Sequence, residues 1–200
     1  KGRGGLTRGD LMLLEMLSQT NWERPLYMSM TVGEDNYLSS LSDFFVQEGL
    51  AYRITPFNWT KLGYSEGREH VADTEHFYHN VKNRFKFGGL KENPNYYVDE
   101  TIQRMIYTHR RLMASLATQL MLEEKNDKAL EILNLAEEEL PSSIVPHGML
   151  VGGFDMAKCY MQLGVKDKAK EILSQMADEQ LEYVKWYCSL DKRRFENSVQ

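Results

Sequence analysis

The chain has 200 residues, of which 42% are hydrophobic and 26% are charged, the composition of an ordinary globular protein. Its net charge of −5 comes without any block of basic residues, which argues against nucleic acid or an anionic membrane surface as the main partner. No apolar run approaches the roughly 18 residues of a membrane span. The chain opens at Lys1 without an initiator Met, and we expect it to be a fragment of a longer protein.

The first 55 residues predict one helix and two strands. Thr7 is followed by an acidic residue at Asp10, a spacing that forms a capping box at the start of a helix. Apolar and polar residues then alternate over 26–32 and again over 50–55, as in strands that bury one face. Between them, 38–49 carries apolar residues at helical spacing. Because strand, helix and strand form a crossover unit, we expect the two strands to be parallel.

The remainder of the chain is predicted to be mostly helical after a polar loop at 57–71. Apolar residues recur at spacings of three and four, and Pro or Gly interrupts the pattern between segments. Helices are predicted over 74–85, 98–124, 126–140, 154–164 and from 167 onward, with a separate last helix through Leu181 and Val184.

An internal repeat organises this helical part. The segment Asp127-Lys-Ala-Leu-Glu-Ile-Leu133 returns forty residues later as Asp167-Lys-Ala-Lys-Glu-Ile-Leu173, and six of the seven residues are identical. A repeat of this length indicates two copies of one supersecondary unit stacked on each other. Small residues recur where two helices must approach closely, so we expect helix–helix contacts at Ala117, Ala129, Ala157 and Ala169.

The two copies resemble tetratricopeptide repeats, although their spacing of forty residues exceeds the usual period of about 34. The first copy has Leu120 where the second has Tyr160, and Glu124 where a Gly is expected. We therefore predict a mainly helical α+β chain. Its small α/β part, residues 1–95, packs on a helical repeat part, residues 96–200, made of a long helix and two tetratricopeptide-like hairpins.

Several short motifs occur in order along the chain: Asn21-Trp-Glu-Arg-Pro-Leu-Tyr27, Thr31-Val-Gly33, Glu48-Gly-Leu-Ala-Tyr-Arg-Ile54, and Tyr97-Val-Asp-Glu-Thr101 with Arg104-Met105. Together they resemble the protein O-mannosyltransferase-like family of large Bacteroidota membrane proteins, which is catalogued as a domain of unknown function. The resemblance covers nearly the whole chain, including the repeats.

The resemblance implies that the chain is the soluble C-terminal part of an inner-membrane protein and lies on the periplasmic side. In such proteins an N-terminal multi-span region carries the glycosyl transfer, from a lipid-linked sugar to protein hydroxyls. That region is not in this sequence, so the resemblance assigns no catalytic residue to any position here.

Trp22, Arg53 and Trp59 are the candidate partner-binding residues. They come from predicted loops or strand ends of the N-terminal part. Aromatic faces beside a guanidinium suit a sugar or a peptide segment, and these residue types dominate binding energy at interfaces. The alternative is packing, because large aromatic side chains are usually mostly buried.

His76 and His79 are the only candidates for a metal site. They stand three residues apart on a predicted helix, which places both on one face. A third ligand with a defined position is missing from the pattern, so the alternative is a pair of surface histidines, and we expect neither a metal nor a cofactor. The sequence has no nucleophile elbow, phosphate loop or dinucleotide fingerprint, and we expect this chain alone not to be an enzyme.

Three functions remain open at this point. The first is a non-catalytic accessory domain of a membrane glycosyltransferase-like protein, which binds an acceptor protein or a glycan-bearing partner. The second is a stand-alone tetratricopeptide-like scaffold for protein interaction. The third is an enzyme with an unrecognised site in the α/β part. A multi-span membrane region encoded directly upstream of Lys1 would favour the first.

Overall fold

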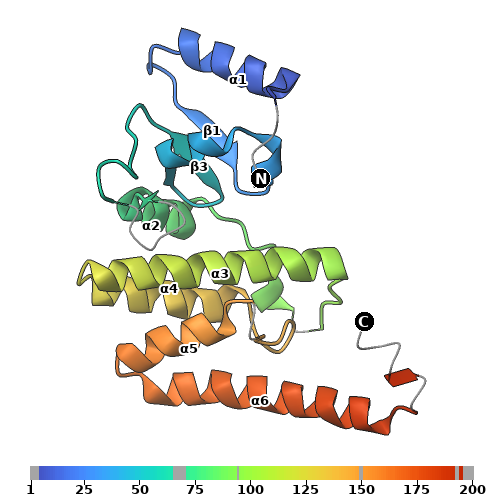
Figure 1. Ribbon diagram of the computed structural model, residues 1–200. Coiled ribbons are helices and arrows are strands. Elements are labelled where there is room, and N and C mark those ends of the chain that lie inside the picture. The colour runs from blue at the N-terminus through green and yellow to red at the C-terminus, as the bar shows by residue number, and fades with distance from the viewer. Residues whose placement is uncertain (1–4, 65–70, 94, 149–150, 192–193, 196–200) are drawn as a thin grey trace. The chain divides into compact units, whose positions relative to one another are not determined.

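The computed structural model describes residues 5–64, 71–93, 95–148, 151–191 and 194–195 (Figure 1). Their contacts separate two compact units, Lys1–Phe85 and Lys86–Gln200. The first holds a small four-stranded mixed sheet and the second is helical, so the predicted mainly helical α+β class is confirmed. No helix among the described residues combines the length and the apolar composition that crossing a membrane requires.

The first unit opens with α1 (Arg8–Gln19), which begins at the predicted capping box. The backbone N–H of Asp10 donates to Thr7 Oγ1 at 3.2 Å, and the backbone N–H of Thr7 donates to Asp10 Oδ2 at 2.8 Å. Both bonds satisfy donors that a helix start leaves without an intrahelical partner. Leu13 and Leu17 of α1 pack against the hydrophobic core of this unit.

The sheet contains β1 (Leu26–Ser29), β2 (Phe45–Gln47), β3 (Ala51–Ile54) and β4 (Val71–Ala72), in the order β1-β3-β2-β4. The prediction that the two strands over 26–32 and 50–55 are parallel is wrong, because β1 and β3 pair antiparallel. The segment between them is no crossover helix. It forms a 3₁₀ turn, η2 (Ser39–Phe44), and then β2, which returns to β3 through a hairpin at Gly49 with φ 130°. Glycine permits this positive φ without steric cost.

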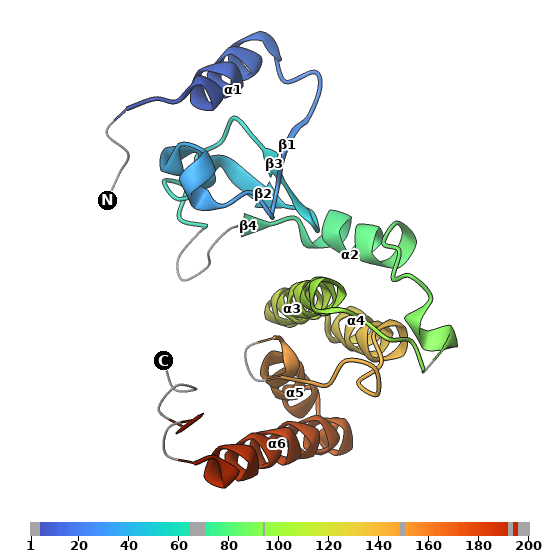
Figure 2. The ribbon, with the colours of Figure 1, turned by 90° about the vertical axis from the view of Figure 1, so that its right-hand side faces the viewer.

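Alternation along the strands gives the sheet two different faces. Tyr52 and Ile54 of β3 point to a core formed with Phe45 and Tyr37, whereas Arg53 between them points to the other face. In both views the sheet lies between α1 and α2 (Figures 1 and 2). The helix α2 (Thr74–Asn83) buries Phe77 and Val81.

The second unit consists of two helical hairpins. The first is α3 (Glu100–Leu122) with α4 (Asn126–Glu139), and the second is α5 (Gly153–Gln162) with α6 (Lys166–Ser189). Helix α5 also packs on α3 and α4, so the hairpins stack, as Figure 2 shows. The four expected contact alanines are each exposed by 2% or less, which confirms their burial. They are Ala117, Ala129, Ala157 and Ala169.

The predicted separate last helix is wrong, because α6 runs without interruption to Ser189. The first copy ends its second helix at Pro141, whereas the second copy has neither Pro nor Gly between Lys166 and Ser189. Nothing in the backbone therefore stops α6 at the point equivalent to the end of α4.

The two copies of the repeat also end their first helices, α3 and α5, in the same way. Glu124 has φ 61° and Gly164 has φ 81°, and both lie just after their helices. The next N–H in each copy, from Lys125 or Val165, donates to a carbonyl five residues back at 2.8 and 2.9 Å respectively. This is the left-handed helix ending in which glycine is usual.

Candidate functional site

A polar cluster occupies the face of the sheet that Arg53 shares with α2. Glu48 follows β2, Tyr27 lies on β1, Asp73 caps α2, and His76 stands in the first turn of α2. The strands place Tyr27 and Arg53 on this face because both neighbours of each residue along its strand point to the other side. The hairpin at 48–50 and the start of α2 bring the acidic groups to them.

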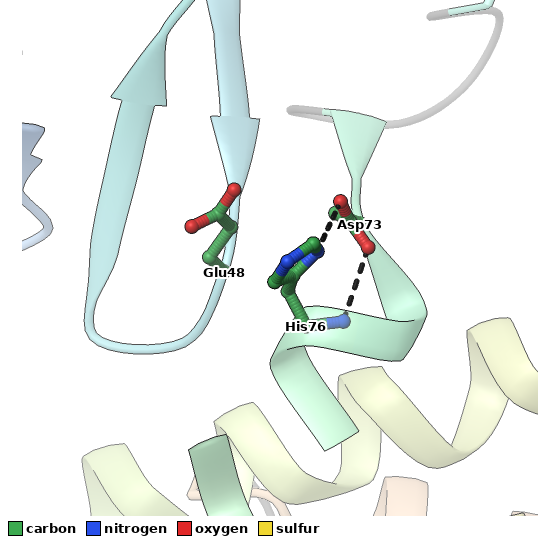
Figure 3. Close-up of side chains that lie close together, drawn as sticks. All are labelled: Glu48, Asp73 and His76. Carbon is green, nitrogen blue, oxygen red and sulfur yellow. Dashed lines mark hydrogen bonds and ion pairs between the residues drawn. The ribbon is translucent and has the colours of Figure 1, made fainter. Parts of the chain in front are cut away.

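The distances define a chain of charged contacts. Arg53 Nε lies 2.6 Å from Glu48 Oε1, and the Tyr27 hydroxyl donates to Glu48 Oε2 at 2.9 Å. Arg53 Nη2 lies 3.9 Å from Asp73 Oδ2. Figure 3 shows the continuation, in which His76 Nδ1 lies 2.8 Å from the same Asp73 oxygen. Glu48 is the most buried side chain of this group at 8% exposure, and His76 is the most exposed at 67%.

This cluster has the donor set of a cation site, because Glu48, Asp73 and His76 each offer one ligand atom within 4.8 Å of the others. Two carboxylates and an imidazole suit a divalent metal. The guanidinium of Arg53 already compensates both carboxylates, however, and a cation would have to displace it. The arrangement is therefore better matched to an ion-pair network that joins two strands to α2. His79 is exposed and lies outside this group.

The environment of Glu48 also affects the phenol of Tyr27. Partial burial raises the pKa of Tyr27 above 10.0, and its hydrogen bond to the Glu48 carboxylate and the negative charge of that group raise the pKa further. Tyr27 therefore remains a hydrogen-bond donor at neutral pH.

A second feature of this unit is a group of aromatic side chains in the loop after β3, which we call the aromatic surface: Phe57, Trp59 and Tyr64. The Trp59 ring meets Phe57 edge-on at 5.9 Å between centroids and Tyr64 at 5.7 Å. Phe57 and Tyr64 are 57% and 62% exposed, and Trp59 is half-buried between them. The chain thus presents to solvent a group of three rings in edge-to-face contact.

Hydrogen bonds hold the loop that carries these rings. The Trp59 indole N–H donates to Thr55 Oγ1 at 2.9 Å, and the Trp59 backbone N–H donates to the Asp43 carbonyl at 2.9 Å. The Thr60 hydroxyl donates to Asp43 Oδ1 at 2.8 Å. The loop is therefore tied to the segment before β2, and the rings need little ordering when a ligand binds.

The structure separates the three candidate partner-binding residues. Trp59 belongs to the aromatic surface, and Arg53 is engaged by Glu48. Trp22 lies in the turn between α1 and β1, with φ 60° and 47% exposure. Among the described residues, no hydrogen bond or ring contact joins Trp22 to the other two. Their role in binding stays a prediction.

Phe57 and Tyr64 are not among the predicted binding residues, because the sequence predicts a polar loop over 57–71. Its signal was the density of aromatic residues around Trp59 in Phe57-Asn-Trp-Thr-Lys-Leu-Gly-Tyr64. Glu48 and Asp73 are not predicted either, because they come from segments far apart in the chain.

In the second unit the most buried polar groups have a structural role. The Arg110 guanidinium is fully buried and donates to the carbonyls of Pro146 at 2.9 Å and Leu140 at 2.7 Å. Burial lowers the pKa of Arg110, and the negative charge of Glu137 opposes this. These bonds fix the connection between the hairpins, so Arg110 is an anchor of the fold rather than an anion-binding group.

Comparison with known proteins gives one finding for the first unit. Residues 2–76 match the family model described as TMEM260-associated domain 2. The matched segment contains the aromatic surface and the whole polar cluster, whereas the two helical hairpins lie outside it. None of the curated proteins and none of the solved structures matches the chain. The N-terminal unit is therefore similar to a domain associated with TMEM260.

Proposed function

We propose that this chain is a non-catalytic accessory region of a membrane glycosyltransferase-like protein, and that it binds the acceptor polypeptide through the aromatic surface. The match of residues 2–76 supports the first half of the proposal, since TMEM260 is a predicted O-mannosyltransferase-like membrane protein. The periplasmic location and the tetratricopeptide-like character of the hairpins belong to the same proposal.

The aromatic surface is the observation that carries the binding role. Two of its rings are more than half exposed, and both contact Trp59, so the three rings form one contiguous apolar patch of the kind that marks a binding site. Their orientation is fixed by the Trp59–Thr55 hydrogen bond and by the bonds to Asp43. Rigid aromatic side chains supply a large contact area at a low cost in conformational entropy. An extended Ser- or Thr-rich peptide, or the apolar face of a sugar on it, fits such a surface.

One specific observation supports a second candidate, an enzyme that uses the polar cluster. His76 and Asp73 form a pair of the kind that serves as a general base, and Glu48 completes three convergent donor atoms. The Arg53 guanidinium weighs against this candidate, because it holds Glu48 in an ion pair. A hydrolytic or transfer activity of the purified chain that His76→Ala abolishes would establish the enzyme and overturn the accessory role.

The binding role can be tested by photo-cross-linking in cells. A photoreactive phenylalanine analogue replaces Tyr64 in one variant and Tyr97, an 88% exposed residue of the second unit, in a matched control. We expect the first variant to capture polypeptides that carry Ser/Thr-linked sugars, and Trp59→Ala in the same chain to reduce that capture. Equal capture by both variants, or capture that Trp59→Ala leaves unchanged, would rule out the aromatic surface as the binding site.

A further inference from the structure

The second unit contains a pocket between the start of α3, the end of α4 and the segment 86–98 that precedes α3. Its volume is about 420 Å³, within the range of small-molecule sites in proteins. The buried part of its lining is apolar, because Val98, Ile106 and Leu140 are each exposed by 7% or less. Four further lining side chains are large, hydrophobic and between 44% and 88% exposed: Tyr96, Tyr97, Ile102 and Met105. An exposed hydrophobic patch that continues into a cavity marks a binding site for an apolar group.

Contacts within the unit hold the walls of this pocket in place. The 3₁₀ turn η3 (Leu90–Glu92) packs on α4, and Lys91 Nζ lies 3.0 Å from Glu138 Oε1 on that helix. The Val98 carbonyl accepts a hydrogen bond from Gln103 Nε2 of α3 at 3.3 Å. The pocket is therefore formed before a ligand arrives, and binding requires little ordering of the chain.

His109 and Phe87 also line the pocket, and their rings contact each other. The Phe87 ring meets the His109 ring edge-on, with 6.0 Å between the centroids. His109 Nδ1 donates to the Met105 carbonyl at 2.8 Å, because a carbonyl oxygen can only accept. These contacts fix the orientation of the imidazole, which adds a polar ring to a mainly apolar lining.

The pocket combines this apolar lining with a positive charge. Lys86 lines the pocket, is exposed, and makes no hydrogen bond or ion pair with another described residue. No Asp or Glu is among the described residues of the lining, although the chain has 29 acidic residues and a net charge of −5. An ammonium group beside an apolar cavity is complementary to a ligand that joins an apolar body to a negative charge.

From these observations we propose that the pocket binds an amphiphile with one aliphatic chain and an anionic head group. The aliphatic chain packs against Val98, Ile106 and Leu140, and the head group meets the Lys86 ammonium. The site lies in the second unit, so it is independent of the aromatic surface and of the function proposed for that surface.

The polar groups of the pocket favour an aliphatic chain over a peptide segment. The amide groups of a peptide would need hydrogen-bond partners on entering an apolar cavity. The described lining side chains offer few such partners, namely the Lys86 ammonium, the His109 imidazole and the phenols of Tyr96 and Tyr97. An aliphatic chain needs none, and its single head group is matched by a single ammonium.

Isothermal titration calorimetry of the full chain with three ten-carbon probes tests this proposal. We expect saturable binding of decanoate at one site per chain. Decanol has the same aliphatic chain without the charge, and it should bind at least about fivefold more weakly. Decyltrimethylammonium should bind more weakly still. Because a chain of net charge −5 attracts cations rather than anions, non-specific attraction cannot produce this order.

A substitution at Lys86 separates the charge from the cavity. Lys86→Gln should reduce the affinity for decanoate at least about fivefold and leave the affinity for decanol unchanged. Lys170→Gln is the matched control, since Lys170 is an exposed lysine of α6 that does not line the pocket. It should change neither affinity.

Methionine methyl signals in nuclear magnetic resonance report where the aliphatic chain binds. In the full chain with carbon-13 methyl groups on methionine, each signal is assigned by a Met→Leu variant. We expect the Met105 signal to shift with decanoate and to saturate at the concentration that calorimetry gives. The Met12 signal, from a residue of the first unit that is 67% exposed against 55% for Met105, should stay in place.

Three results would overturn the proposal. The first is the absence of saturable decanoate binding. The second is an equal affinity for decanoate and decanol, or a decanoate affinity that Lys86→Gln leaves unchanged, because the positive charge then selects nothing. The third is a Met105 signal that moves no more than the Met12 signal, which would place the bound chain elsewhere.

Discussion

The two copies of the repeat end their first helices in the same left-handed conformation with different residues, and this allows opposite effects to be predicted at equivalent positions. A residue with a Cβ at positive φ costs roughly 1–2 kcal/mol. Glycine avoids this strain, but it adds about 0.4–1 kcal/mol of conformational entropy to the unfolded chain. An ideal Cβ at Gly164 would meet no atom within 4 Å, so the backbone alone decides the effect there.

The difference between these two terms gives the magnitude. We expect Glu124→Gly to raise the free energy of unfolding by about 1 kcal/mol and Gly164→Ala to lower it by a similar amount. Glu123→Gly is the control, because Glu123 has φ −92°, where glycine relieves no strain, adds its entropic cost and removes the ion pair of Glu123 with Lys125. That variant should be less stable than the parent.

Urea unfolding followed by far-ultraviolet circular dichroism measures all three variants. The reasoning fails if Glu124→Gly is no more stable than the parent, or if Glu124→Gly and Glu123→Gly have the same free energy of unfolding. It also fails if Gly164→Ala is neutral, because a Cβ at φ 81° should be strained even where it touches nothing.

Three further predictions concern packing, pH and the polar cluster. Ala169→Leu and Ala129→Leu should each lose about 1–3 kcal/mol in denaturant melts, because both alanines are fully buried between helices; neutral results at both would contradict the hairpin packing. Burial raises the pKa of Tyr160 above 10.0, so the unfolded chain loses this proton first and the free energy of unfolding should fall as the pH rises past 10.0. A pH series of melts should show a shallower fall for Tyr160→Phe, and an unchanged slope would count against this assignment. Arg53→Ala should lose about 1–3 kcal/mol of stability, because it leaves the buried Glu48 carboxylate without its cation. Denaturant melts of Arg53→Ala and of the control Arg53→Lys measure this loss. A loss within about 0.5 kcal/mol would show that the ion pair is not structural.

The helical unit was predictable because its signals are local. The spacing of apolar residues and the residues that interrupt it on either side of α4 predict the helices of this unit, and the repeat predicts the four contact alanines. Helix formation and the close approach of small residues depend on positions a few residues apart, which a sequence displays directly. The continuation of α6 to Ser189 was not predicted, because apolar spacing does not show whether the next turn belongs to the same helix. A helix continues wherever no residue stops it.

The sheet was less predictable because strand direction depends on where the chain turns. Gly49 was visible as a break, but the apolar spacing over 38–49 matched a helix, and the three-residue β2 is too short to show a period. The two-residue β4 presents the same difficulty. Arg110 illustrates the limit for side chains, since its burial depends on two carbonyls that are 30 and 36 residues away.

The candidate binding site shows the same division. The sequence shows that residue 59 is a Trp, and this predicts an aromatic binding contact. The exposure of Phe57 and Tyr64 could not be predicted from the sequence, because it depends on the hydrogen bonds that tie their loop to Asp43. The pairing of Arg53 with Glu48 likewise arises from the hairpin, and it changes Arg53 from a free binding group into a partner in an ion pair.

The indole N–H signals of the three tryptophans offer the most direct test of the account. Trp59 lies in the aromatic surface, Trp22 in a turn of the same unit, and Trp186 on α6 of the other unit, where it serves as an internal control. Each signal is assigned by a Trp→Phe variant. The labelled chain is then titrated with a Ser/Thr-rich peptide, unmodified and O-mannosylated, and followed by two-dimensional nuclear magnetic resonance. The account predicts a saturable shift of the Trp59 signal with at least one peptide and a stationary Trp186 signal. A Trp59 signal that stays in place with both peptides, or one that moves no more than that of Trp186, would contradict it.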